Sequence, residues 1–242
     1  GSTYQSKAGF IDSTYEKEVI FSTSKSPSTY QGPAYFAGST YKGWADFSGS
    51  TYQSKAGFID STYEKDVIFS TSDFPSTYQG LAAFSGSTYQ GGADFHESIY
   101  QAEVDLSKSV YQDWVDFHES TYWGDANFSE SAYRSWADFY DSTYQDEASF
   151  TGSTYQEGVD LSCSIYWGRA NFRGSIYEDE AAFSGSIFQD TIDFVKIQAA
   201  AVLPVSHDAP LRSMTRQTSK THFLAHPIMT SPPKTARAAP FS

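Results

Sequence analysis

The sequence predicts an all-β solenoid, a coil of very short strands separated by turns, and three observations support this fold class. An 11-residue unit repeats along most of the chain from Ser2 onward. Aromatic residues make up 17% of the 242 residues, and Tyr and Phe favour strands over helices. Within each unit a small and a large residue stand two positions apart, which is typical of side chains on one side of an extended backbone.

The repeat defines the domain organisation. Seventeen units, with four-residue insertions before Ser28 and Ser76, fill a repeat domain at residues 1–196. Residues 1–32 and 49–80 differ at three positions, which indicates a tandem duplication. Beyond it, residues 197–242 contain six of the nine prolines and no repeat aromatic. We expect a short cap at 199–203 (AAAVL), which would cover the open end of the last coil, followed by a flexible, Pro-rich, basic tail.

Each unit contributes two large residues to the predicted core. A Tyr-type position recurs from Tyr4 to Phe188 with Ser two residues before it, and a Phe-type position recurs from Phe10 to Phe194 with Ala, Val or Ile two residues before it. In the most regular units the predicted core ladder is Tyr89, Phe95, Tyr100, Leu106, Tyr111, Phe117, Tyr122, Phe128, Tyr133 and Phe139. Because buried hydroxyls need partners, we expect the tyrosine hydroxyls to bond to the serines or to corner carbonyls, or to emerge at a corner.

Half-units of this repeat resemble a known signature. ADFSG (45–49), VDLSK (104–108) and ANFSE (126–130) look like the A(D/N)LXX motif of the pentapeptide-repeat family, and the chain is most similar to the Phe/Tyr-rich branch in which five- and six-residue steps alternate. The resemblance covers about four fifths of the chain and departs from the family in its alternate tyrosines and its insertions. It implies a right-handed quadrilateral β-helix with about 22 residues per coil.

A flattened solenoid with 11 residues per coil is the alternative. The string FHES at 95–98 recurs at 117–120, and Trp114 recurs as Trp136, so two features repeat at intervals of 22. The VDLS strings that begin at 104 and 159 do not fit that interval. The internal pattern therefore favours the larger coil.

The negative charge of the chain limits the classes of molecule that it can bind. The formal net charge is −13, and the acidic residues concentrate in residues 87–196, where the residues before Phe or Leu predict an acidic face at Asp94, Asp105, Asp116, Asp138 and Asp160. An acidic rod is unsuited to direct nucleic-acid binding, which depends on cationic side chains. Some pentapeptide-repeat proteins instead mimic duplex DNA and occupy a type II topoisomerase, which makes DNA mimicry an alternative function. A solvated face is the simpler interpretation.

Two further patterns suggest binding sites. The pairs His96, Glu97 and His118, Glu119 would lie in register on adjacent 22-residue coils, about 4.8 Å apart, and could share a metal. Two solvated corners, with no metal, are the simpler interpretation. An ice-binding array is an alternative for the Thr column (Thr3, Thr14, Thr29, Thr40, Thr51, Thr62, Thr77 and Thr88), although Thr is also an ordinary strand residue.

The sequence does not predict an enzyme or a cofactor. Cys163 is the single cysteine, and a lone cysteine is more often inert than catalytic. Phosphate-binding glycine loops and nucleophile elbows are missing from the sequence, and so is an apolar run long enough to insert into a membrane. We therefore expect a non-enzymatic structural or protein-binding scaffold. One cysteine leaves the compartment open, with a cytoplasmic protein as the preferred expectation.

The N-terminal end predicts a contact. The sequence opens inside a repeat unit at Gly1, so the first coil should present strand edges and the rings of Tyr4 and Phe10. We expect an end-to-end homodimer, or stacking onto further coils, through this surface.

Overall fold

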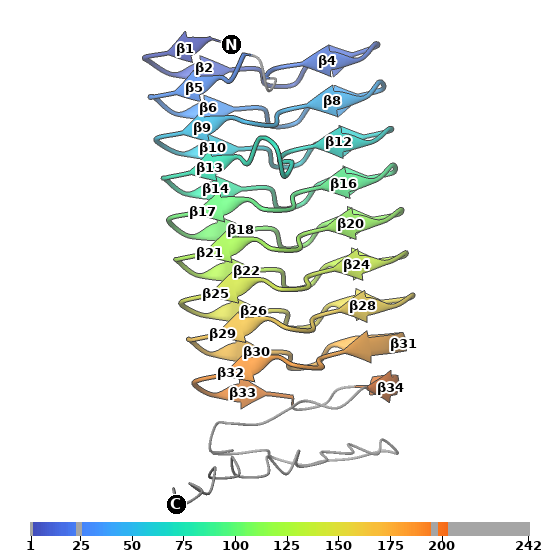
Figure 1. The fold of residues 1–242 in the computed structure, drawn as a ribbon. Helices are drawn as coiled ribbons and strands as arrows, with labels where there is room; N and C mark the ends of the chain where they lie inside the picture. Colours follow the sequence, from blue (N-terminus) through green and yellow to red (C-terminus); the bar gives the residue numbers. More distant parts are fainter. Residues whose placement is uncertain (1, 23–25, 195–197, 203–242) are drawn as a thin grey trace, which may run out of the picture.

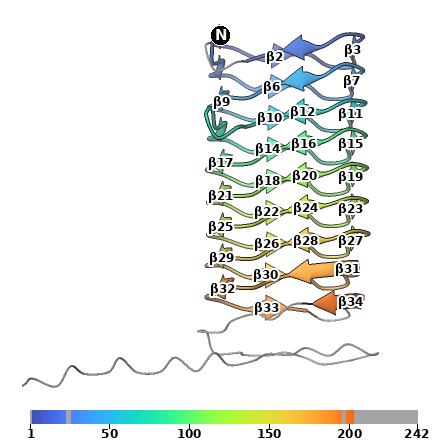
Figure 2. The same cartoon turned by 45° about the vertical axis from the view of Figure 1, so that its right-hand side comes forward.

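The chain winds into a parallel β-solenoid in which each coil has four two-residue strands, one on each side of a quadrilateral (Figures 1 and 2). The computed structural model describes residues 2–22, 26–194 and 198–202. Strands equivalent in successive coils pair side by side and form four faces. In chain order we name them the first Tyr face, the first Phe face, the second Tyr face and the second Phe face.

The strands of each face share one position of the repeat. The first Tyr face is β1 (Thr3–Tyr4), β5 (Thr29–Tyr30), β9 (Thr51–Tyr52), β13 (Thr77–Tyr78), β17 (Ile99–Tyr100), β21 (Thr121–Tyr122), β25 (Thr143–Tyr144), β29 (Ile165–Tyr166) and β32 (Ile187–Phe188). The first Phe face is β2 (Ala8–Gly9), β6 (Ala34–Tyr35), β10 (Ala56–Gly57), β14 (Ala82–Ala83), β18 (Val104–Asp105), β22 (Ala126–Asn127), β26 (Ala148–Ser149), β30 (Ala170–Asn171) and β33 (Ile192–Asp193).

The other two faces join at the last strands. The second Tyr face is β3 (Thr14–Tyr15), β7 (Thr40–Tyr41), β11 (Thr62–Tyr63), β15 (Thr88–Tyr89), β19 (Val110–Tyr111), β23 (Ala132–Tyr133) and β27 (Thr154–Tyr155). The second Phe face is β4 (Val19–Ile20), β8 (Ala45–Asp46), β12 (Val67–Ile68), β16 (Ala93–Asp94), β20 (Val115–Asp116), β24 (Ala137–Asp138) and β28 (Val159–Asp160). The seven-residue β31 (Ile176–Ala182) pairs with both β27 and β28, and β34 (Gln198–Val202) pairs with β31.

The register confirms a coil of 22 residues and excludes the flattened solenoid. Thr29 pairs with Thr51, and the Ser39 N–H donates to the Ser61 hydroxyl 22 residues later. Where an insertion occurs the interval becomes 26, as between Ser50 and Ser76. The strands on both sides of an insertion therefore keep their length and register.

The second insertion forms a small hairpin outside the coil, visible between β12 and β13 in Figure 1. Thr71 and Phe74 form an antiparallel bridge, and the Gly49 N–H donates to the Phe74 carbonyl at 2.9 Å. Within the same coil the Ser76 hydroxyl donates to the Phe69 carbonyl at 2.6 Å. The corner is thus completed locally, and the strands on both sides keep their register.

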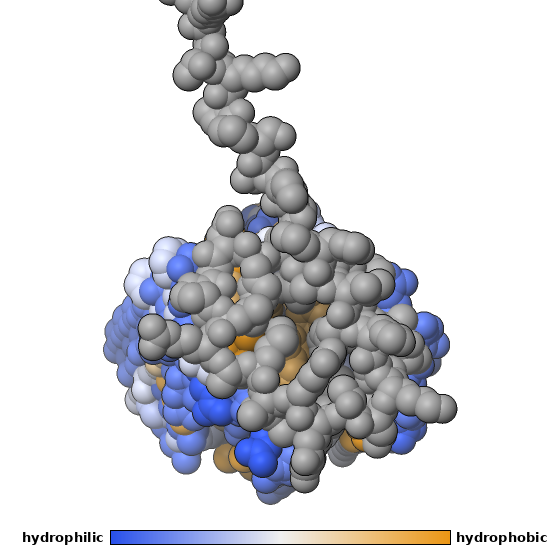
Figure 3. Space-filling model, turned by 90° about the horizontal axis from the view of Figure 1, so that it is seen from below, coloured by the Kyte–Doolittle hydropathy of each residue, from blue (hydrophilic) through white to orange (hydrophobic). Residues whose placement is uncertain are grey.

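The core is a set of stacked aromatic columns. The ring centroids of Tyr30 and Tyr52 lie 4.9 Å apart, and those of Phe36 and Phe58 lie 4.8 Å apart, with the two rings of each pair nearly parallel. Tyr and Phe of one coil meet edge to face, as in the pair Tyr30 and Phe36. The structure buries all ten residues of the predicted core ladder at 0% exposure, namely Tyr89, Phe95, Tyr100, Leu106, Tyr111, Phe117, Tyr122, Phe128, Tyr133 and Phe139. Seen along the axis, hydrophobic residues show at the centre and hydrophilic residues line most of the perimeter (Figure 3).

The serines before the tyrosines bond the backbone of the neighbouring coil. The Ser120 hydroxyl accepts the Ser98 N–H at 3.2 Å and donates to the Phe95 carbonyl at 3.2 Å. Phe95 and Ser98 are the first and last residues of a corner turn whose third residue, Glu97, has a φ of 52°. Each such serine therefore closes the turn of the coil before it and joins the two coils.

The expectation that the tyrosine hydroxyls bond to these serines is wrong. The hydroxyls of the buried tyrosines, such as Tyr111 and Tyr122, have no hydrogen-bond partner among the described residues. Burial raises the pKa of Tyr111 far above its ordinary 10.0, and Tyr89 and Tyr133 raise it further, whereas nearby Ser109 lowers it. The Ser109 hydroxyl donates to the Phe84 carbonyl at 3.3 Å instead. The Tyr111 hydroxyl therefore lies near Ser109 but makes no hydrogen bond with a described residue.

The two ends of the solenoid differ. In the first coil Tyr4, Phe10, Tyr15, Val19 and Phe21 are only partly buried, whereas the equivalent rings of the second coil are fully buried. The predicted end-to-end contact stays a prediction. At the other end β34 continues the sheet by pairing with β31, while the rest of the predicted tail, residues 203–242, lies outside the described residues.

In the described part of the chain, no helix has the length and apolarity that crossing a membrane requires.

Replacing Phe128 by Ala tests the aromatic ladder. We expect Phe128→Ala to lower the free energy of unfolding in denaturant by about 3–5 kcal/mol, because it removes a fully buried ring and leaves a cavity. Phe74→Ala, in the inserted hairpin with 37% exposure, is the matched control and should change stability by about 0.5 kcal/mol or less. A loss below about 1 kcal/mol for Phe128→Ala would show that the ladder is not the core.

Removing one buried hydroxyl should stabilise the protein. Tyr111→Phe keeps the stacked ring and deletes a group without a partner, so the free energy of unfolding should rise by roughly 1 kcal/mol or more. Tyr140→Phe, at a position 39% exposed, is the control and should be nearly neutral. Destabilisation by Tyr111→Phe would mean that the hydroxyl has a partner after all.

High pH should unfold the solenoid cooperatively. The buried tyrosines have folded-state pKa values raised above 10.0, so the unfolded chain loses these protons first. Their contribution to stability is complete below pH 10 and is lost as the pH rises above it. Tyrosinate absorbance and circular dichroism, recorded together, should change in one transition above pH 10. Ionisation of most tyrosines near pH 10 with the circular dichroism unchanged would contradict the buried ladder.

Candidate functional site

The predicted acidic face is divided between two opposite sides of the solenoid. Asp94, Asp116, Asp138 and Asp160 are register partners in four successive coils of the second Phe face. Asp105 lies instead on the first Phe face, in register with Asn127. The single face is corrected to two, because a 22-residue coil places alternate 11-residue units on opposite sides.

These aspartates also have a local structural role. Oδ1 of Asp116 accepts the backbone N–H of His118 at 2.9 Å, and Oδ1 of Asp138 accepts that of Tyr140 at 2.9 Å. Asn127 accepts the Ser129 N–H in the same way at 3.1 Å. Each Asp or Asn thus stabilises the turn that follows its strand. Sequence reasoning missed this role, although the exchange of Asp for Asn was its signal, since both offer the same acceptor oxygen.

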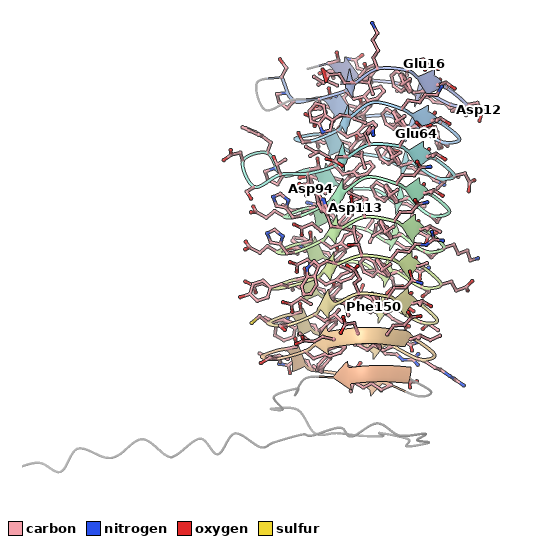
Figure 4. The ribbon with its side chains drawn as sticks, turned by 90° about the vertical axis from the view of Figure 1, so that its right-hand side faces the viewer. Asp12, Glu16, Glu64, Asp94, Asp113 and Phe150 are labelled. Carbon is pink, nitrogen blue, oxygen red and sulfur yellow. The ribbon has the colours of Figure 1, made fainter. Side chains whose placement is uncertain are left out.

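The two histidines lie in register, but their carboxylate partners differ from those predicted. The rings of His96 and His118 stack, with their centroids 4.8 Å apart and an angle of 3° between their planes. Nδ1 of His96 bonds Oδ1 of Asp94 at 2.5 Å, and Nδ1 of His118 bonds Oδ1 of Asp116 at 2.6 Å. Figure 4 shows this side of the solenoid with Asp94 labelled.

Glu97 and Glu119 are not the partners of these histidines. Both occupy the left-handed position of a corner turn, with φ of 52° and 53°. The groups whose ligand atoms lie within 4.8 Å of one another are Asp94, His96 and Asp116, and then Asp116, His118 and Asp138. The structure does not test whether His96, Glu97, His118 and Glu119 bind a metal, but it places strand aspartates, and not these glutamates, beside the two histidines.

The surroundings of the two histidines differ because of the inserted hairpin. The backbone N–H of Ser72 donates to Nε2 of His96 at 2.8 Å, and the Ser72 hydroxyl lies 3.0 Å from the same atom. The hydrogen bond with Asp94 raises the pKa of His96 above its ordinary 6.5, although burial opposes the rise. Both ring nitrogens of His96 are therefore occupied by the protein. No described residue bonds Nε2 of His118 in this way.

The first Phe face carries an acidic groove of about 600 Å³. Its lining includes five carboxylates and one lysine, and the full set is Glu103, Asp105, Ser107, Lys108, Asp125, Ala126, Asn127, Ser129, Glu130, Glu147, Ser149 and Thr151. Glu103, Asp125 and Glu147 precede β18, β22 and β26, so they form a column along one margin. We call this surface the acidic groove.

Exposed tryptophans stand beside the acidic groove. Trp123 and Trp167 are 51% and 54% exposed, and they occupy the corners that lead from the first Tyr face into β22 and β30. Trp123 is two residues from Asp125 in the groove lining. Arg169, two residues after Trp167, lies 3.9 Å from Glu147 and 3.4 Å from Asp193. The groove margin therefore combines large exposed aromatic surface with negative charge.

The Thr column is also divided. Thr3, Thr29, Thr51 and Thr77 follow one another on the first Tyr face, and Thr14, Thr40, Thr62 and Thr88 do so on the second Tyr face. The next residues in the two ladders are Ile99 and Val110. Each face therefore presents an unbroken file of four Thr side chains, half of the eight that the sequence suggested as one array.

Comparisons with known proteins add little. No protein-family model and no curated protein matches the chain. Among solved structures the chain is similar to QnrB1, a plasmid-mediated fluoroquinolone resistance protein, at 13% identity over 84% of this chain and 91% of that one. The TM-score is 0.25. A likeness of this size carries no argument about function, which must come from the surface itself.

Proposed function

We propose that this chain is a non-enzymatic β-solenoid scaffold of the pentapeptide-repeat kind, which binds a basic segment of a partner protein in its acidic groove. The observation that carries the proposal is the combination of five carboxylates, a hollow of about 600 Å³ and exposed tryptophans on one face. The assignment to the pentapeptide-repeat family is supported by the 22-residue, four-sided coil and by half-units such as ADFSG (45–49).

Electrostatics favours a cationic partner. The five carboxylates of the groove are accompanied by one lysine of the lining, Lys108, and by Arg169, whose guanidinium lies 3.9 Å from Glu147. The whole chain has a formal net charge of −13. A surface of one sign accelerates the association of an oppositely charged partner and disfavours partners of the same sign. The acidic surface also opposes direct contact with nucleic acid. Arg-rich or Lys-rich protein segments fit this charge best.

The tryptophans provide binding energy that charge alone does not. Tryptophan is enriched among the residues that dominate protein interfaces, and an arginine over an indole face contributes about 0.5–2 kcal/mol. Trp123 and Trp167 project from corners of a regular solenoid, so little conformational freedom of the backbone is lost when a partner binds. An extended basic segment lying along the groove can contact carboxylates of successive coils and both indoles.

DNA mimicry is a second candidate, favoured by one observation. Two columns of acid follow the axis on opposite faces: Asp94, Asp116, Asp138 and Asp160 on one, and Glu103, Asp125 and Glu147 on the other. This arrangement is comparable to the two charged strands of a duplex. A supercoiling assay with a type II topoisomerase separates the candidates, since mimicry predicts inhibition and groove binding of a basic segment does not.

Charge removal in the groove should weaken binding of a basic peptide. The probe is a fluorescent arginine-rich peptide, measured by anisotropy against the full chain. The variant Glu103→Gln, Asp125→Asn, Glu147→Gln should lose at least tenfold in affinity, about 1.4 kcal/mol. The matched control, Glu64→Gln, Glu157→Gln, Glu178→Gln, removes the same charge from two corners between the second Tyr and second Phe faces and from β31, and it should lose less than about twofold. Trp123→Ala should also weaken binding of the peptide, because it removes an exposed indole beside the groove.

If both triple variants lost the same affinity for the peptide, net charge alone would explain the binding. That result would contradict a defined groove. No measurable binding by the wild-type chain at low salt would also contradict it. Circular dichroism of all variants checks that the solenoid is retained. The amide replacements keep an oxygen acceptor, so the bond from the Glu147 N–H to Oδ1 of residue 125, 3.1 Å in the wild type, should survive.

A further inference from the structure

We propose that Asp116, His118 and Asp138 bind one divalent transition-metal ion of the zinc class, at a site on the second Phe face, opposite the acidic groove. One ligand atom from each residue lies within 4.8 Å of the other two. An imidazole nitrogen with two carboxylate oxygens is a donor set that zinc, nickel and cobalt accept, with water completing the coordination. The site does not depend on the proposed function of the groove.

The backbone positions all three ligands. Asp116 and Asp138 are register partners on β20 and β24, and His118 follows Asp116 by two residues, with its Nδ1 at 2.6 Å from Oδ1. Backbone N–H groups of His118 and Tyr140 hold Oδ1 of the two aspartates. Each carboxylate has a second oxygen and further lone pairs for a metal. Turn hydrogen bonds therefore orient the two aspartates in advance, whereas His118 must exchange its Nδ1 hydrogen bond to Asp116 for the metal.

The charge of this column favours a cation. Asp116 lies between Asp94 and Asp138, and Asp138 lies between Asp116 and Asp160. Carboxylates in register on successive coils repel one another, and a divalent ion between Asp116 and Asp138 would relieve that repulsion.

The inserted hairpin distinguishes this triad from its neighbour. In the group Asp94, His96 and Asp116, Nε2 of His96 accepts the Ser72 N–H. Its proton must therefore stay on Nδ1, which bonds Asp94 and has no lone pair left for a metal. His118 has no such contact in the described part of the chain. Nδ1 of His118 lies 2.6 Å from Oδ1 of Asp116, so coordination through Nδ1 requires that this hydrogen bond be given up and that the proton stand on Nε2, which no described residue occupies.

The experiment is a titration of the full chain with zinc chloride by calorimetry. His118→Ala and Asp138→Asn should each weaken one zinc site by at least tenfold. His96→Ala should leave that site within about twofold, because His96 is bound by the hairpin. Three other histidines, His207, His222 and His226, belong to the same chain, so the decisive quantity is the loss of one equivalent of zinc between variant and wild type. Circular dichroism confirms that each variant is folded.

Cobalt provides an independent readout. Its visible absorption reports imidazole coordination, and this signal should lose one site's contribution in His118→Ala and keep it in His96→Ala. The proposal is overturned if the wild-type chain binds no zinc, or if His118→Ala retains every equivalent with unchanged affinity. It is also overturned if His96→Ala abolishes the site, which would assign the metal to the neighbouring triad.

Discussion

The stacking of each coil's aromatic rings on the rings of the next is the interaction on which the rest of the solenoid depends. The ring centroids of Tyr on Tyr and of Phe on Phe lie 4.5–5.3 Å apart, as in Tyr41 with Tyr63 and Phe36 with Phe58, both at 4.8 Å. This is about the spacing at which strands hydrogen-bond. Rings and strands can satisfy both contacts only if equivalent positions recur once per coil. Extra residues must then leave the coil, and the hairpin at Thr71 and Phe74 is the result.

This constraint explains why the core was predictable and the fate of its hydroxyls was not. A core position must hold a large residue and must recur at a fixed spacing, and both properties are visible in a sequence. The hydroxyl of Tyr111 was expected to find a partner because an unpaired one costs about 1–3 kcal/mol. Burying the ring contributes a similar amount, roughly 1.5–3 kcal/mol, and stacking adds to it. The serines meanwhile bond to backbone groups at the corners, so ring packing prevails over hydroxyl pairing.

The candidate site was predictable in part. The register of His96 with His118 followed from the 22-residue interval, but their carboxylate partners did not follow from adjacency in sequence. Glu97 stands next to His96, yet it lies at the left-handed position of the corner turn. Asp94, two residues earlier, bonds the ring. The acidic groove was not predictable, because its lining comes from successive coils and from corners whose directions the repeat pattern does not specify.

Departures from the repeat therefore carry more functional information than the repeat itself. The string DFHES occurs at 94–98 and again at 116–120, with the same turns and stacked rings. A hairpin inserted one coil earlier reaches His96 through Ser72 and leaves His118 free of that contact. The indoles at Trp123 and Trp167 are another such departure, because Gln occupies the same corner position in most other coils of this face. In a solenoid each coil contacts mainly its neighbours, so a local insertion or substitution can give one coil a chemistry that its copies lack, without disturbing the stacked core.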